Sequence, residues 1–70
     1  MDNPDLIIII NGEKVIKILG SEYNANYYDN AIKKAIDKYR KYIFKLKEIA
    51  DLPEEIDNCI RKIEVYELEN

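Results

Sequence analysis

Five consecutive aliphatic residues, Leu6 to Ile10, are followed at once by the pair Asn11-Gly12. A type I′ turn needs positive φ at both of its central residues, and Asn and Gly tolerate that geometry best. The pair therefore predicts a β-hairpin with strands over about residues 5–10 and 13–19. This hairpin constrains the fold more than any other feature of the chain, because the fold must bury its many aliphatic side chains.

The length of the loop sets the register of the hairpin and hence the content of its two faces. A two-residue loop places Ile10 opposite Glu13 and Leu6 opposite Lys17. Because side chains alternate between faces, both faces come out largely apolar. The predicted sets are Ile7, Ile9, Ile16 and Ile18 on one face, and Leu6, Ile8, Ile10, Val15 and Leu19 on the other.

The chain is short for a fold with two apolar faces to cover. Its 70 residues form a single small domain, 1–70, and domains of this size bury only about 60% of the surface that their unfolded chains expose. Such domains usually need disulfides, a metal or a partner chain. A disulfide within the chain is excluded because Cys59 is the only cysteine, and zinc is not expected without histidine. The sequence therefore favours association between copies.

The second face of the hairpin has three possible covers. A short C-terminal helix could wrap over it, the C-terminal tail could add a third strand, or a second copy of the chain could pack against it. We expect a homo-oligomer, and we place its interface on one face of the hairpin. The predicted interface residues are Leu6, Ile8, Ile10 and Val15.

A long amphipathic helix is predicted over about residues 26–50. Asn26 is a candidate N-cap, and Asn24 is the alternative, with Tyr23 and Tyr28 forming a hydrophobic staple across the start. Apolar residues at spacings of three and four make one broad stripe, typical of a helix that lies on a core. The stripe comprises Tyr28, Ile32, Ala35, Ile36, Tyr39, Tyr42, Ile43, Leu46, Ile49 and Ala50.

A second helix is predicted over about residues 53–64. Asp51 is its candidate cap, Pro53 suits its first turn, and Glu54 favours the positive end of the helix dipole. The tail over residues 62–68 is ambiguous, since it would also serve as a short terminal strand. The predicted fold class is thus α+β: a hairpin, a long helix, and a C-terminal helix with a possible terminal strand.

The sequence offers little material for catalysis. It contains no histidine, and Ser21 is its only serine, so an activated nucleophile with a base beside it is not expected. Cys59 lies on the apolar stripe of the second predicted helix, where a free cysteine usually packs in a core. Gly12 and Gly20 are the only glycines, too few for a phosphate-binding loop. We predict neither an enzyme nor a cofactor nor a metal.

Charge is concentrated on the long predicted helix. Residues 23–47 hold seven cations and two acids, a net of +5, in a chain of net charge −3. Lysine and arginine supply charge for a phosphate, and aromatic rings supply surfaces for stacking. The helical wheel places Phe44 away from the apolar stripe, among lysines. The predicted ligand-binding residues are Tyr27, Lys34, Lys38, Arg40, Lys41, Phe44 and Lys45.

These patterns predict a small non-catalytic binding protein. We expect an oligomer that sequesters a small anionic ligand, such as a cyclic nucleotide, as phage counter-defence or inhibitor proteins do. One alternative is an inhibitor or adaptor that blocks a host protein through a surface around Phe44, and another is a structural assembly subunit. Duplex nucleic acid is not an expected partner, because an acidic chain repels its phosphates. No stretch is long and apolar enough for a membrane span, and we expect an intracellular, cytoplasmic protein, in the host cell if it is viral.

Overall fold

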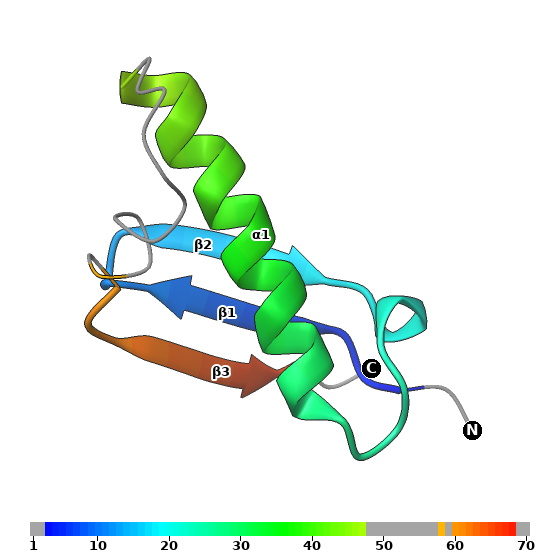
Figure 1. Cartoon of the computed structure of the whole chain (residues 1–70). Coiled ribbons are helices and arrows are strands. Elements are labelled where there is room, and N and C mark those ends of the chain that lie inside the picture. The colour runs from blue at the N-terminus through cyan, green and yellow to red at the C-terminus, as the bar shows by residue number, and fades with distance from the viewer. Residues whose placement is uncertain (1–2, 48–57, 59, 69–70) are drawn as a thin grey trace.

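The computed structural model describes residues 3–47, 58 and 60–68, which form a three-stranded antiparallel sheet with a helix on one face (Figure 1). The strand order is β2-β1-β3, so the first strand lies in the centre of the sheet. Helix α1 crosses the sheet diagonally (Figure 1). The elements are β1 (Leu6–Ile10), β2 (Lys14–Ile18), the 3-10 turn η1 (Gly20–Glu22), α1 (Tyr28–Lys47) and β3 (Ile63–Glu67).

The turn between β1 and β2 has the backbone geometry that its residues predict. The φ angles of Asn11 and Gly12 are 57° and 69°, and the N–H of Glu13 donates to the Ile10 carbonyl at 3.1 Å. The predicted register is nevertheless wrong by one residue, because Ile10 pairs with Lys14 and not with Glu13. Glu13 is an extra loop residue before the ladder begins.

That single residue changes which side chains share a face. Ile16 and Ile18 join the residues of β1 that point toward α1, instead of lying opposite them as predicted. Val15 moves to the other face, beside Ile9. One face of the hairpin is therefore fully buried, and its members are Leu6, Ile8, Ile10, Ile16 and Ile18.

Helix α1 begins at Tyr28, two residues later than predicted. Asn26 does not act as the N-cap, because its φ of 66° places it in a left-handed turn before the helix. The predicted contact between Tyr23 and Tyr28 is present, with ring centroids 6.2 Å apart. The predicted end near residue 50 lies outside the described residues.

The buried side of α1 is narrow and regular. Ala31, Ala35 and Tyr39, spaced by four residues, are buried against the sheet. The two small side chains allow the helix backbone to approach the strands, while the Tyr39 ring fills the space near the hairpin turn. The core is completed by Tyr23, which follows η1, and by the partly buried Ile32, Ile43, Ile60 and Ile63.

The predicted C-terminal helix over 53–64 is wrong from residue 60 onward, because residues 60–62 are not helical and residues 63–64 are in a strand. Ile63 and Glu64 belong to β3, which pairs antiparallel with β1 from Leu6↔Glu67 to Ile10↔Ile63. Residues 53–57 and 59 of that prediction lie outside the described residues. The physical reason is that the central strand has a second edge with unpaired backbone groups, and the alternating, β-branched tail satisfies them. The described residues hold one α-helix and three strands.

Asn11 joins the hairpin turn to two distant parts of the chain. Its backbone N–H donates to the Lys62 carbonyl at 2.8 Å. Its side-chain Oδ1 accepts from the backbone N–H of Arg61 at 2.7 Å, and its Nδ2 donates to the Tyr39 hydroxyl at 3.2 Å. The residue that the turn selects for positive φ thus also fixes where β3 begins and where α1 passes the turn.

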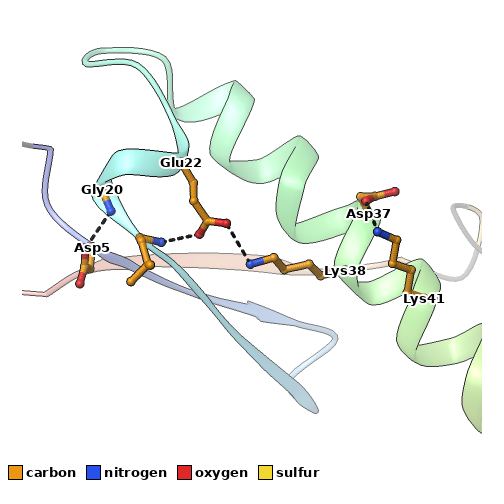
Figure 2. Close-up of polar contacts among 7 residues, drawn as sticks. Asp5, Gly20, Glu22, Asp37, Lys38 and Lys41 are labelled. Atoms are coloured by element: carbon orange, nitrogen blue, oxygen red, sulfur yellow. Dashed lines mark hydrogen bonds and ion pairs between the residues drawn. The ribbon is translucent and has the colours of Figure 1, made fainter.

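Gly20 is required by the packing of the N-terminal segment. Its N–H donates to Asp5 Oδ1 at 2.7 Å (Figure 2), and its carbonyl accepts from Asn3 Nδ2 at 3.1 Å. A Cβ at Gly20 would lie 1.9 Å from the backbone oxygen of Asn3. No side chain fits there unless the N-terminal segment moves away.

Candidate functional site: a lysine groove beside strand β2

An open groove of about 360 Å³ lies between the free edge of β2 and the C-terminal half of α1. One side chain of β2, Lys14, and three of α1 bring positive charge to it, whereas the pairing register places the Lys17 side chain on the opposite face of the sheet. Every charged residue that lines the groove is a lysine. The lining residues are Lys14, Val15, Ile16, Lys17, Lys38, Lys41, Tyr42 and Lys45. We call this site the lysine groove.

Helical spacing and strand topology together create the lysine groove. Lys38, Lys41 and Lys45 are separated by three and four residues, which places them on one side of α1. Lys14 and Lys17 come from β2, an edge strand with α1 as its neighbour above the sheet. Lys14 faces α1 and is more than twenty residues from the helix lysines in sequence, so only the tertiary fold brings its charge to theirs.

Three of the lysines are held by ion pairs at the surface. Lys38 Nζ lies 3.3 Å from Glu22 Oε1 and Lys41 Nζ lies 3.3 Å from Asp37 Oδ2 (Figure 2). Lys17 Nζ lies 3.9 Å from an Asp5 carboxylate oxygen. Exposed pairs of this kind contribute only about 0–1 kcal/mol, so a more highly charged anion can take these lysines from their carboxylates.

Glu22 lies outside the groove but holds one of its lysines, Lys38, in an ion pair. Its carboxylate accepts from the Leu19 backbone N–H at 2.7 Å as well as from Lys38. The Leu19 hydrogen bond is the largest cause that lowers the pKa of Glu22, and the interactions with Lys38 lower it further against the effect of burial. Glu22 is therefore ionised at neutral pH and holds the Lys38 ammonium beside the groove.

Tyr42 gives the groove an aromatic surface. The Lys14 ammonium lies 4.3 Å from the centroid of the Tyr42 ring, a cation–π geometry. The same ring is 6.2 Å from the ring of the buried Tyr39, which restrains its position, and Tyr42 is 37% exposed. The groove thus contains a partly exposed ring that has one face under the Lys14 ammonium and is restrained by Tyr39.

The structure brings together three of the seven residues predicted to bind ligand, namely Lys38, Lys41 and Lys45. Lys34 lies instead at a second cavity, with Lys33 and the segment after η1. Tyr27 is exposed just before α1, and Arg40 is half-buried. The side chain of Phe44 lies outside the described residues.

Sequence reasoning missed Lys14, Lys17 and Tyr42. Tyr42 was assigned to the buried stripe of the helix, and neither Lys14 nor Lys17 was included among the predicted ligand-binding residues. The available signal was the lysine content of the second hairpin strand, which indicates an exposed edge.

The four residues predicted to form an oligomer interface do not share a surface. Leu6, Ile8 and Ile10 are 0% exposed beneath α1, whereas Val15 is 57% exposed on the opposite face of the sheet. The predicted set therefore divides between the core and an exposed face.

Among the described residues, no helix is long and apolar enough to cross a membrane. The same residues contain no cluster of three or more Cys, Asp or Glu side chains placed to hold a metal ion. Comparison with known protein families, with curated proteins and with solved structures gives no match to this chain.

Proposed function

We propose that this is a non-catalytic binding protein that takes a small phosphate-bearing ligand, such as a nucleotide, in the lysine groove. The observation that carries the proposal is that four lysine side chains from two elements, Lys14 on β2 and three on α1, lie at one groove, with the Lys14 ammonium beside the Tyr42 ring. Ammonium groups bind phosphate oxygens as point charges, and the ring face of Tyr42 supports a base.

The dimensions of the groove favour a small ligand. Its volume of about 360 Å³ lies at the lower end of the range of roughly 300–1,000 Å³ typical of small-molecule sites. Among residues 3–47, 58 and 60–68, no strand pairs with the outer edge of β2, whose backbone groups lie along one wall. A compact anion with one planar part, as in a cyclic nucleotide, can contact the lysine ammonium groups, the Tyr42 ring and the backbone groups of β2. Sequestration of such a molecule in the cytoplasm, as a phage-type counter-defence protein would do, is the role that we infer for this binding.

Thermal unfolding in the presence of cyclic dinucleotides, ATP and inorganic phosphate tests the proposal. A ligand at a hundredfold excess over its dissociation constant stabilises the folded state by about 2.7 kcal/mol, so the midpoint should rise. Lys41→Ala and Lys45→Ala should reduce that shift. Lys33→Ala is the matched control, because Lys33 is also an exposed lysine of α1 but lies outside the groove.

Two results would contradict the proposal. One is the absence of any shift with all of these anions. The other is a loss of the shift in Lys33→Ala as large as that in Lys41→Ala, which would indicate a non-specific response to the charge of the helix.

A further inference from the structure

The face of the sheet opposite α1 carries an apolar patch on all three strands. Its members are Ile7 and Ile9 on the central strand, Val15 on β2 and Tyr66 on β3, which the pairing registers place side by side. Val15 is 57% exposed and Tyr66 is 50% exposed. Among the described residues, the single α-helix lies on the other face (Figure 1). We call these four residues the open face.

The sequence of β1 is that of a strand buried on both sides. A strand with one face in water normally alternates apolar and polar residues, and uninterrupted aliphatic runs are typical of strands covered on both faces. In β1 the covered face holds Leu6, Ile8 and Ile10, and the open face still holds two isoleucines. The composition of the central strand thus indicates a second cover.

The charged residues at the borders of the open face indicate which kind of partner covers it. The β2 border carries Lys17, and the β3 border carries Glu64. The Glu64 carboxylate accepts from the Tyr66 hydroxyl at 2.6 Å and lies 3.5 Å from Lys62 Nζ. An apolar centre with a cation on one side and a carboxylate on the other is complementary to itself after a two-fold rotation.

We propose that a second copy of the chain packs on the open face, sheet against sheet, about a two-fold axis parallel to β1. This axis sets β2 of each copy over β3 of the other and brings the isoleucines together in the centre. Lys17 then lies over Tyr66 of the second copy, two residues along the strand from Glu64 of that copy. Edge-to-edge pairing through β2 would instead bring the lysine grooves of two copies together, which like-charge repulsion disfavours.

The extent of the face predicts a dimer that dissociates on dilution. Strands about 4.8 Å apart with about 3.3 Å per residue give three five-residue strands a face of roughly 240 Å² per copy. A standard protein interface buries about 800 Å² on each side. The equilibrium between monomer and dimer is therefore expected to fall within the concentrations that sedimentation experiments reach.

Sedimentation velocity over a series of concentrations tests the proposal. The wild-type chain should pass from one to two copies as concentration rises, and Tyr66→Glu should raise the dissociation constant at least about tenfold by placing a second carboxylate on the patch. Tyr27→Glu is the control, because Tyr27 is equally exposed at 59% and lies outside the open face. Circular dichroism confirms that each variant folds. A wild-type chain that stays monomeric, or equal effects of the two variants, would overturn the proposal.

A charge exchange tests the orientation, and its single variant Glu64→Lys keeps this inference separate from nucleotide binding. Glu64→Lys alone should weaken the dimer, and adding Lys17→Glu should restore it, since the exchange recreates the opposite-charge pairs. A double variant no better than the single one removes the proposed axis. Glu64 and Tyr66 do not line the lysine groove, so Glu64→Lys and Tyr66→Glu leave the ligand-dependent thermal shift unchanged, and either proposal can fail alone.

Discussion

The two faces of the sheet are built from the same kind of residue but have different environments. On the covered face, five aliphatic side chains are buried under α1, whereas on the open face Val15 remains more than half exposed. Ile8 and Ile9 are neighbours in one strand and differ only in the side to which they point. Hydrophobic residues alone therefore indicate that residues 6–10 form a strand. The register and the position of α1 decide which of these residues are in the core.

The largest expected effect comes from truncating this neighbouring pair. Ile8→Ala should lower the free energy of unfolding by about 3 kcal/mol, because it removes a fully buried side chain and leaves a cavity. Ile9→Ala should cost about 1 kcal/mol when measured in dilute protein, since Ile9 is only half-buried in the monomer and loses less buried apolar surface than Ile8. Urea unfolding of both variants measures the difference. Equal losses would mean that the two faces are equally covered in the monomer.

A smaller effect is expected at Asn11, which joins the turn to the residues around the covered face. Asn11→Ala should cost about 2 kcal/mol, because it loses the side-chain hydrogen bonds to Arg61, Lys62 and Tyr39 and strains a position with positive φ. Asn11→Gly retains the permissive backbone and loses only the hydrogen bonds. It should therefore be less damaging than Asn11→Ala in urea unfolding. Identical stabilities of the two variants would show that backbone strain contributes nothing.

Acid pH should weaken the interaction of Glu22 on η1 with Lys38 on α1. The expected loss of stability is smaller than that for Asn11→Ala or Ile8→Ala. The pKa of Glu22 is lowered from 4.5 in the folded protein, so its contribution is present above pH 4.5 and is lost as pH falls through the folded pKa. Glu22 is exposed enough that this amounts to at most about 1 kcal/mol. Glu22→Gln should lower stability at neutral pH and flatten its dependence on pH in that window.

Asp37→Asn is the matched control for the acid experiment. Asp37 also pairs with a lysine of the groove, but within α1, and its side chain is 58% exposed. Because that pair is exposed, its removal should change the free energy of unfolding at neutral pH by less than about 0.5 kcal/mol. A profile for Glu22→Gln as steep as that of the wild type would show that other carboxylates govern acid unfolding.

The smallest effect is expected on the open face. In dilute protein, Val15→Thr should change the free energy of unfolding by less than about 0.5 kcal/mol, as usual for exposed positions. A loss above 1 kcal/mol in the monomer would mean that Val15 is covered within its own chain, and the contrast between the two faces would disappear.

Local patterns were enough to predict the hairpin and the long helix. They were also enough to predict that positive charge is concentrated on that helix. The register could not be predicted, because Asn11-Gly12 determines the central residues of the turn but not whether pairing begins at Glu13 or Lys14. A shift of one residue in the register moves Ile16 and Ile18 to the opposite face of the hairpin, beside Ile8 and Leu6. The tail around Ile63 was ambiguous for a similar reason: its state depends on a free edge of β1 that local sequence does not reveal.

The candidate site was only half predictable. Helical spacing places Lys38, Lys41 and Lys45 together, and that part depends on the periodicity of one element. Lys14 joins them because β2 is an edge strand beside α1, which is a property of topology. The positions of Tyr27 and Lys34 away from the groove follow from the direction in which α1 crosses the sheet, which no local pattern encodes.

The central position of β1 has a consequence for synthesis. The first strand pairs on one side with its hairpin partner, which leaves the ribosome almost immediately, and on the other with residues 63–67. During translation the nascent polypeptide therefore carries an aliphatic strand with one unsatisfied edge until its last strand emerges, a species vulnerable to aggregation. Rapid elongation, or a chaperone that shields this edge, should raise the yield of native protein, whereas truncation before residue 63 should yield insoluble material.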